Sequence, residues 1–267
     1  MSETSQAAAD ALVQSWVSST RLDVSSYPSA PTSAQGMYET HLLIQQHPLV
    51  ATKLGGLGGY KLGGVGLLPG EPCLYAPLFA KYIVDSPGEL LSASSIGMIA
   101  IEPEIGVVMG EALPPRPDGR PHSVEEVWSS ASSVVLVFEV CGKRGTDEAH
   151  VSSTRLGQLA DTLSSGGCVR GQAFPASSLS LDALRCGTKL FVNDLLVAEG
   201  SGGAAPLGGP AEALAFLANH LNSRGLELLP GQLIATGQTC NTKVGKPGDV
   251  VRATFEGLGT VEMRIFP

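Results

Sequence analysis

The sequence predicts an α+β protein in which a helical N-terminal segment precedes a region made mainly of strands. Apolar residues recur at helical spacing near the start of the chain, whereas most apolar runs after Pro77 are short and rich in β-branched residues. The 33 glycines and 18 prolines favour many turns and short strands over long helices. At 267 residues the chain can bury a core as one large domain or two small ones. We divide it into residues 1–70, the helical segment, and residues 71–267.

The first part of the chain contains two predicted helices. Apolar side chains at helical spacing indicate the first, over residues 5–20. A loop rich in serine and proline follows, and the second helix covers about residues 34–46. This helix should end near His47, because the residue before a proline disfavours the α conformation and Pro48 comes next.

Residues 54–66 are rich in glycine and contain Lys61. A phosphate-binding P-loop needs Ser or Thr directly after its lysine, but Leu62 stands there. A tight turn that leads into a short strand, Tyr60–Leu62, is the better interpretation. A lysine between apolar neighbours is usually a surface residue. Lys61 could instead supply the positive charge that an anionic substrate needs.

Most of the chain after Pro77 should form strands joined by turns, with a few helices. The expected strands cover residues 78–84, 96–109, 134–140, 168–170, 189–192, 195–197, 232–236, 249–255 and 260–265. The expected helices start at a Ser123–Glu126 capping box, cover residues 154–162, and run from Pro210 to Ser223. Asn193-Asp194 should form a two-residue hairpin turn.

Three acidic residues stand in apolar runs that read as buried strands. Glu102 and Glu104 are two residues apart in the run 96–109, and alternate residues of a strand share one face. Glu139 is the only charge in the β-branched run 134–140. Neighbouring buried carboxylates repel one another and are costly unless neutralised. A divalent cation that prefers oxygen ligands would neutralise them, so these three residues form a candidate metal site.

A plainer alternative stands beside the metal site. Acids two residues apart are common on the solvated face of an antiparallel strand, where they have no function. The apolar neighbours of Glu139 favour a buried strand and therefore the metal site.

Composition excludes several classes of partner. The net charge of −8 argues against nucleic acid or an anionic membrane surface. No apolar stretch is long enough to span a membrane, and the N-terminus lacks the basic and apolar regions of a targeting signal. The five scattered cysteines indicate free thiols in a reducing compartment. We therefore expect a cytoplasmic protein.

Several segments together resemble the fumarylacetoacetate hydrolase superfamily. In the order of that family they are Gly59–Gly63, Ile101–Ile105, Phe138–Val140, Leu159–Gly167, Thr236-Gly237, Lys246–Val251 and Gly257–Val261. The helical segment, with Met37-Tyr38-Glu39, resembles the branch that holds 2-keto-4-pentenoate hydratase and 4-oxalocrotonate decarboxylase. The resemblance covers nearly the whole chain. It implies a mixed β-roll fold, a homo-oligomer, and a catalytic domain over residues 71–267.

The resemblance also implies the parts of an active site. Glu102, Glu104 and Glu139 fall on three acids that hold Mg²⁺ or Mn²⁺ in that family, and Lys61 falls on its pocket lysine. The candidate catalytic residues are Lys61, Ser164 and Asp161, and the candidate substrate-binding residues are Lys61, Arg144, Ser164 and Thr236. We assign no clear site role to any of the five histidines.

The expected function is that of a metal-dependent lyase, a hydratase or decarboxylase that acts on a small anionic 2-oxo acid through a stabilised enolate. The chain departs from the hydratases that it resembles at three places: Gly142-Lys143-Arg144 replaces Asp-Ser-Arg, Asp161-Thr162 replaces Asp-Asn, and Gly63-Gly64-Val65 replaces Gly-Leu-Thr. Two alternatives therefore stay open. One is a C–C hydrolase acting on acylpyruvate-type diketo acids, and the other is a family member without turnover that serves as a binding protein.

Overall fold

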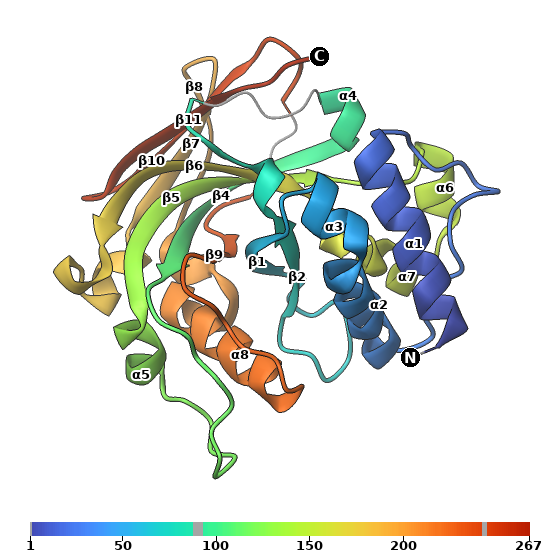
Figure 1. The fold of residues 1–267 in the computed structure, drawn as a ribbon. Coiled ribbons are helices and arrows are strands. Elements are labelled where there is room, and N and C mark those ends of the chain that lie inside the picture. Colours follow the sequence, from blue (N-terminus) through green and yellow to red (C-terminus); the bar gives the residue numbers. More distant parts are fainter. Residues whose placement is uncertain (1, 88–92, 242–244) are drawn as a thin grey trace.

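The computed structural model describes residues 2–87, 93–241 and 245–267, and it shows a strongly curved sheet with the N-terminal helices at one side (Figure 1). Helices α1 (Glu3–Ser18) and α2 (Ala34–Gln46) confirm both N-terminal predictions. The serine before each helix caps it through its side chain. Helix α2 ends at His47 as expected, but α3 (Pro48–Lys53) follows at once, with Pro48 in its first turn. The sequence reasoning missed α3.

The main sheet has seven strands in the order β2-β1-β9-β4-β5-β6-β3. Their bounds are β1 Leu57–Gly63, β2 Leu74–Phe79, β3 Ile83–Asp85, β4 Met98–Met109, β5 Ala131–Gly142, β6 Ser165–Pro175 and β9 Leu233–Gln238. The β1–β9 and β3–β6 pairs are parallel and the others antiparallel, so the expected mixed sheet is confirmed. Strand β1 joins the 1–70 segment to this sheet, because it pairs with β2 and β9 from the rest of the chain.

Two strand predictions were wrong in extent. The expected strand 78–84 is in fact two strands, β2 and β3, separated by a short 3₁₀ turn at Ala80–Tyr82. Strand β2 contains Pro77, which is tolerated because β2 lies at the edge of the sheet. Strand β6 is much longer than the expected 168–170, because pairing with β5 extends it to Pro175.

A second sheet of four strands, in the order β11-β10-β7-β8, packs against the main sheet. Its strands are β7 Gly187–Val192, β8 Leu195–Ser201, β10 Val250–Phe255 and β11 Gly259–Arg264. Asn193 and Asp194 both have positive φ, 49° and 63°, which confirms the two-residue hairpin turn. Apolar side chains of both sheets, such as Phe138 and Phe255, form the core between them.

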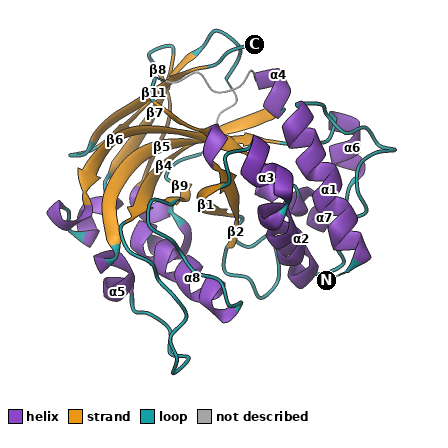
Figure 2. Ribbon diagram, viewed as in Figure 1, coloured by secondary structure: helices purple, strands orange, loops and turns teal. Residues whose placement is uncertain are grey.

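The remaining helices are α4 Ala93–Ile96, α5 Val124–Ser129, α6 Asp147–Ser152, α7 Arg155–Ala160 and α8 Pro210–Ser223. Short 3₁₀ turns occur at Thr162–Ser164, Ala176–Ser178, Leu181–Arg185, Gly202–Ala204 and Pro206–Gly208. The capping box of α5 and the bounds of α8 are as predicted. Helix α8 packs on β4 and β9, whereas α1, α2, α3, α6 and α7 gather at the other side of the molecule (Figure 2). Among the described residues, no helix has the length and apolar character needed to cross a membrane.

Candidate active site

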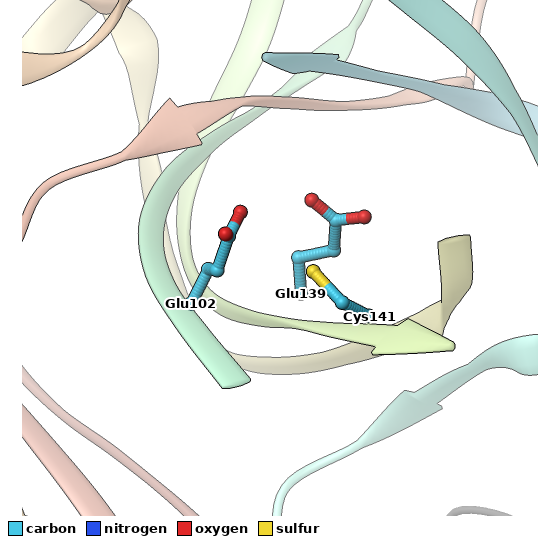
Figure 3. Close-up of side chains that lie close together, drawn as sticks. All are labelled: Glu102, Glu139 and Cys141. Carbon is cyan, nitrogen blue, oxygen red and sulfur yellow. The ribbon is translucent and has the colours of Figure 1, made fainter. Parts of the chain in front are cut away.

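The three predicted acids converge at the centre of the main sheet. Glu102 and Glu104 lie on β4, and Glu139 lies on β5 directly opposite Glu102 in the strand register. Cys141, two residues further along β5, shares the face of Glu139. A carboxylate oxygen from Glu102, one from Glu139 and the sulfur of Cys141 all lie within 4.8 Å of one another. Figure 3 shows these three side chains close together. This group could hold a metal ion.

Two of these acids are completely buried. Glu104 and Glu139 are each 0% exposed, while Glu102 is partly buried. Burial, followed by the charges of Glu139 and Glu102, raises the pKa of Glu104 well above its usual range. Burial also raises the pKa of Glu139, although the Lys61 ammonium opposes the shift. The solvated-face alternative, which concerned Glu102 and Glu104, is therefore wrong for Glu104, and Glu102 is only partly exposed.

Several oxygens of the acids lack a hydrogen bond. The backbone N–H of Gly237, at the end of β9, donates to Glu104 Oε2 at 2.8 Å. Among the described residues, no hydrogen-bond partner is found for Glu104 Oε1 or Glu139 Oε2, and Glu139 Oε1 is met by the Lys61 ammonium. Unsatisfied buried oxygens are costly, and their presence together fits a group that binds a cation.

Lys61 is buried with the acids rather than exposed at the surface. It is only 4% exposed, and its Nζ lies 3.0 Å from Glu139 Oε1. The same ammonium donates to the carbonyl of Leu163 at 3.1 Å. Burial disfavours the charged form, but the carboxylate of Glu139 and the other acids outweigh it and raise the pKa of Lys61. Lys61 is therefore held as a cation beside the acids.

An unusual turn presents Leu163 to Lys61. Helix α7 ends at Ala160, earlier than the expected 162, and Thr162, Leu163 and Ser164 then take positive φ values of 45°, 52° and 56°. A non-glycine residue in this left-handed region costs about 1–2 kcal/mol. The turn directs the Leu163 carbonyl to Lys61 and places Ser164 on the wall of the adjoining cavity.

Asp161, directly before this turn, is held by Arg144. The Arg144 backbone N–H donates to Asp161 Oδ2 at 2.5 Å, and the Arg144 guanidinium lies 3.8 Å from the centre of the Trp16 ring. The guanidinium also donates to the carbonyl of Ile96 at 2.7 Å. Both residues are buried, and neither lines the cavity beside the acids. Both side chains are therefore engaged within the protein interior rather than at the cavity wall.

Thr236 is also turned away from the cavity. Its hydroxyl donates to the carbonyl of Ile105 at 2.6 Å, and the side chain is fully buried. The next residue, Gly237, provides the backbone contact to Glu104. The Thr-Gly turn thus contacts the acids through its backbone, while the Thr236 hydroxyl is used within the sheet.

A cavity of 570 Å³ adjoins the acids, a volume typical of small-molecule sites. The strands contribute Lys61, Glu102, Cys141 and Gln238 to its wall, and the turn after α7 contributes Ser164. Helices α6 and α7 add three polar side chains, those of His150, Arg155 and Gln158. Burial, together with the cations Lys143 and Arg21, lowers the pKa of His150, so its imidazole is neutral near pH 7.

The sequence reasoning missed part of this wall. Strand alternation from Glu139 would have indicated Cys141, because residues i and i+2 share a face. His150 and Arg155 gave no such signal, since α6 was not predicted and the cavity forms only where α6 and α7 meet the sheet.

Fold and site together define a family. Residues 72–266 match the family described as "Fumarylacetoacetate (FAA) hydrolase C-terminal", and the chain belongs to that family. This confirms the resemblance and the expected fold.

Comparison with known proteins indicates the branch. The chain is 32% identical over 173 residues to "2-keto-4-pentenoate hydratase" of Paraburkholderia xenovorans (strain LB400). The matched residues make up 65% of this chain and 61% of that protein. The match thus spans about three fifths of the hydratase's length. Over 216 residues the chain is 28% identical to "4-oxalocrotonate decarboxylase" of Pseudomonas putida, covering 81% of this chain and 77% of that one.

Solved structures share the fold. A 4-oxalocrotonate decarboxylase from Pseudomonas putida G7, complexed with magnesium and adipate, superimposes with a TM-score of 0.82 at 23% identity and covers 99% of this chain and 98% of its own. A fumarylpyruvate hydrolase from Pseudomonas aeruginosa, in complex with Mn²⁺ and pyruvate, superimposes with a TM-score of 0.59 at 18% identity. This superposition covers 78% of this chain and 88% of the hydrolase. The first superposition includes the N-terminal helices, because it spans almost the whole chain.

Proposed function

We propose that this protein is a divalent-metal-dependent lyase that hydrates or decarboxylates a small 2-oxo acid. The observation that carries the proposal is the group of Glu102 and Glu139 with Lys61, beside a cavity of small-molecule size. The buried Glu104, on the same strand as Glu102, feels the charges of both other acids. Relatives described as hydratases and a decarboxylase support the same reading.

The acids suit Mg²⁺ or Mn²⁺. Both are hard cations that take carboxylate oxygens as ligands. Glu102, Glu104 and Glu139 would hold the ion, and Glu104 Oε1 and Glu139 Oε2, which have no hydrogen-bond partner among the described residues, are free to act as its ligands. When bound, the ion would act as a Lewis acid and template for the carboxylate and keto oxygens of the substrate.

The protein's own residues supply charge and position. Hydration and decarboxylation of such acids both develop negative charge on the 2-keto oxygen, which a fixed positive charge stabilises. Lys61 is such a charge, since it stays protonated among the acids and lines the cavity. Ser164 and Gln238 add hydrogen-bonding side chains to the same wall. Arg144 and Asp161 act as positioning residues for the turn that carries Ser164.

The decisive test is turnover by the purified protein with Mg²⁺. We expect loss of the ultraviolet absorbance of 2-hydroxypentadienoate or 4-oxalocrotonate, and expect this loss to disappear in Glu104→Ala. Release of pyruvate from an acylpyruvate, with no change in either lyase substrate, would establish the hydrolase alternative instead. Tight binding of Mg²⁺ and oxalate without turnover of any of these acids would support a binding protein.

A further inference from the structure

We propose that Arg155 binds a second carboxylate, so that the substrate is a dicarboxylic 2-oxo acid. The assignment rests on the proposed function, because it assumes that the 2-oxo end of the substrate lies at Glu102, Glu104 and Glu139. The charges on the cavity wall and the direction of α7 carry the argument.

Arg155 is the cation on the described cavity wall that has no carboxylate partner. The other permanent cation there, Lys61, is paired with Glu139. Among the residues that the structure describes, the hydrogen bond found for Arg155 is a marginal one, 3.5 Å from its Nη1 to Gln158 Oε1. An arginine guanidinium binds a carboxylate through two parallel hydrogen bonds. A contact as long as the one to Gln158 would compete only weakly with such binding.

Helix α7 separates Arg155 from the acids. Its C-terminal end leads into the turn whose Leu163 carbonyl accepts from Lys61, and Arg155 is its first residue. A rise of 1.5 Å per residue puts Arg155 roughly 7 Å along the axis from Ala160. A short dicarboxylic acid spans a comparable length. Leu159 and Leu163 also line the cavity, and their apolar side chains suit a carbon chain between two charged ends.

The arrangement gives Arg155 a role in specificity rather than in the chemical step. A monocarboxylic 2-oxo acid would bind equally well to the metal ion that the acids would hold. It would leave the guanidinium of Arg155 in water. Since Arg155 is exposed, its gain is limited by competition with solvent, and we expect about a tenfold preference for the diacid.

The test compares matched acids on the full protein with Mg²⁺ by isothermal titration calorimetry. The pairs are 2-oxoglutarate with 2-oxopentanoate, and 2-oxoadipate with 2-oxohexanoate. Binding of oxalate measures the metal site alone, without a contribution from Arg155. We expect wild type to bind at least one diacid about tenfold more tightly than its partner. In Arg155→Gln this preference should vanish while oxalate binding is unchanged. Arg120→Gln removes an exposed cation outside the cavity wall and should leave the preference intact.

The outcomes separate the two proposals. Oxalate binding with no diacid preference in wild type, or a preference that survives in Arg155→Gln, would overturn the role of Arg155 alone. If oxalate fails to bind wild type in the presence of Mg²⁺, the proposed function fails, and the role of Arg155 fails with it.

Discussion

Lys61 Nζ lies 3.0 Å from Glu139 Oε1, and both side chains are buried in the centre of the main sheet. The two residues come from strands that are not neighbours, because β9 and β4 lie between β1 and β5. This contact places a permanent cation among three acids. It therefore links the stability of the sheet to the chemistry of the cavity.

Replacing Lys61 by methionine should destabilise the metal-free protein. Removing one partner of a buried ion pair typically costs about 3–5 kcal/mol, because the other charge is left uncompensated. We expect a loss of about 3 kcal/mol in the free energy of unfolding, measured by urea denaturation with EDTA.

Two further variants test the cause of that loss. The double variant Lys61→Met/Glu139→Gln should recover part of the stability, since it no longer leaves an unpaired acid. Lys53→Met changes an exposed lysine of α3 and should have little effect. An equal loss in the single and double variants would contradict the ion-pair explanation.

Glu104→Gln should weaken metal binding without weakening the metal-free fold. The buried carboxylate of Glu104 has a raised pKa, so its charge opposes folding at neutral pH, and glutamine can still accept from the N–H of Gly237. We expect Mn²⁺ affinity, followed by electron paramagnetic resonance, to fall at least about tenfold. The midpoint of thermal unfolding in EDTA should stay the same or rise. Glu125→Gln, on exposed α5, should leave both quantities unchanged.

Cys141 should allow soft metals to compete for the site. A thiolate favours Zn²⁺ over Mg²⁺, and the Cys141 sulfur lies within 4.8 Å of the oxygens of Glu102 and Glu139. We expect Zn²⁺ to displace Mn²⁺ in competition titrations, and Cys141→Ser to reduce that advantage about tenfold or more while Mg²⁺ binding changes little. The partly exposed Cys186 lies outside this group, and Cys186→Ser serves as the control. Equal Zn²⁺ affinity in both variants would exclude the sulfur as a ligand.

His41 should make the fold sensitive to acid. Burial lowers the pKa of His41 to about 4, despite the hydrogen-bonding distance of 3.0 Å between its Nε2 and the Leu159 carbonyl. The unfolded chain therefore takes up the proton first, near pH 6.5, so this stability is present above that pH and is lost as the pH falls towards 4. The full effect is about 3 kcal/mol.

The matched variant for this test is His41→Gln, whose amide can donate to Leu159 without titrating. Urea denaturation of both proteins between pH 7.5 and about 4.5 measures the effect. The stability of wild type relative to the variant should decrease across this range. A constant difference would show that His41 does not take part in the acid response.

The fold was predictable where local rules decide it. Apolar spacing located α1, Pro48 after His47 located the end of α2, and Asn193-Asp194 located the hairpin turn. Helices α3 and α6 were missed because each has only 6 residues, too short for a periodic apolar pattern to show. The start of β2 was misplaced because an edge strand accepts Pro77, whereas the sequence reasoning began the strand after it.

The candidate site also has features that local sequence rules predict and features that they do not. The sequence by itself determined that Glu102 and Glu104 share a face and that Glu139 stands alone in an apolar strand, because strand periodicity and the cost of burying charge are local arguments. Only the tertiary structure decided which other residues join them. It paired Lys61 with Glu139 across two strands, turned Arg144 and Thr236 inward, and brought Arg155 to the cavity. These contacts join residues far apart in the chain, and their partners are selected by packing rather than by neighbouring sequence.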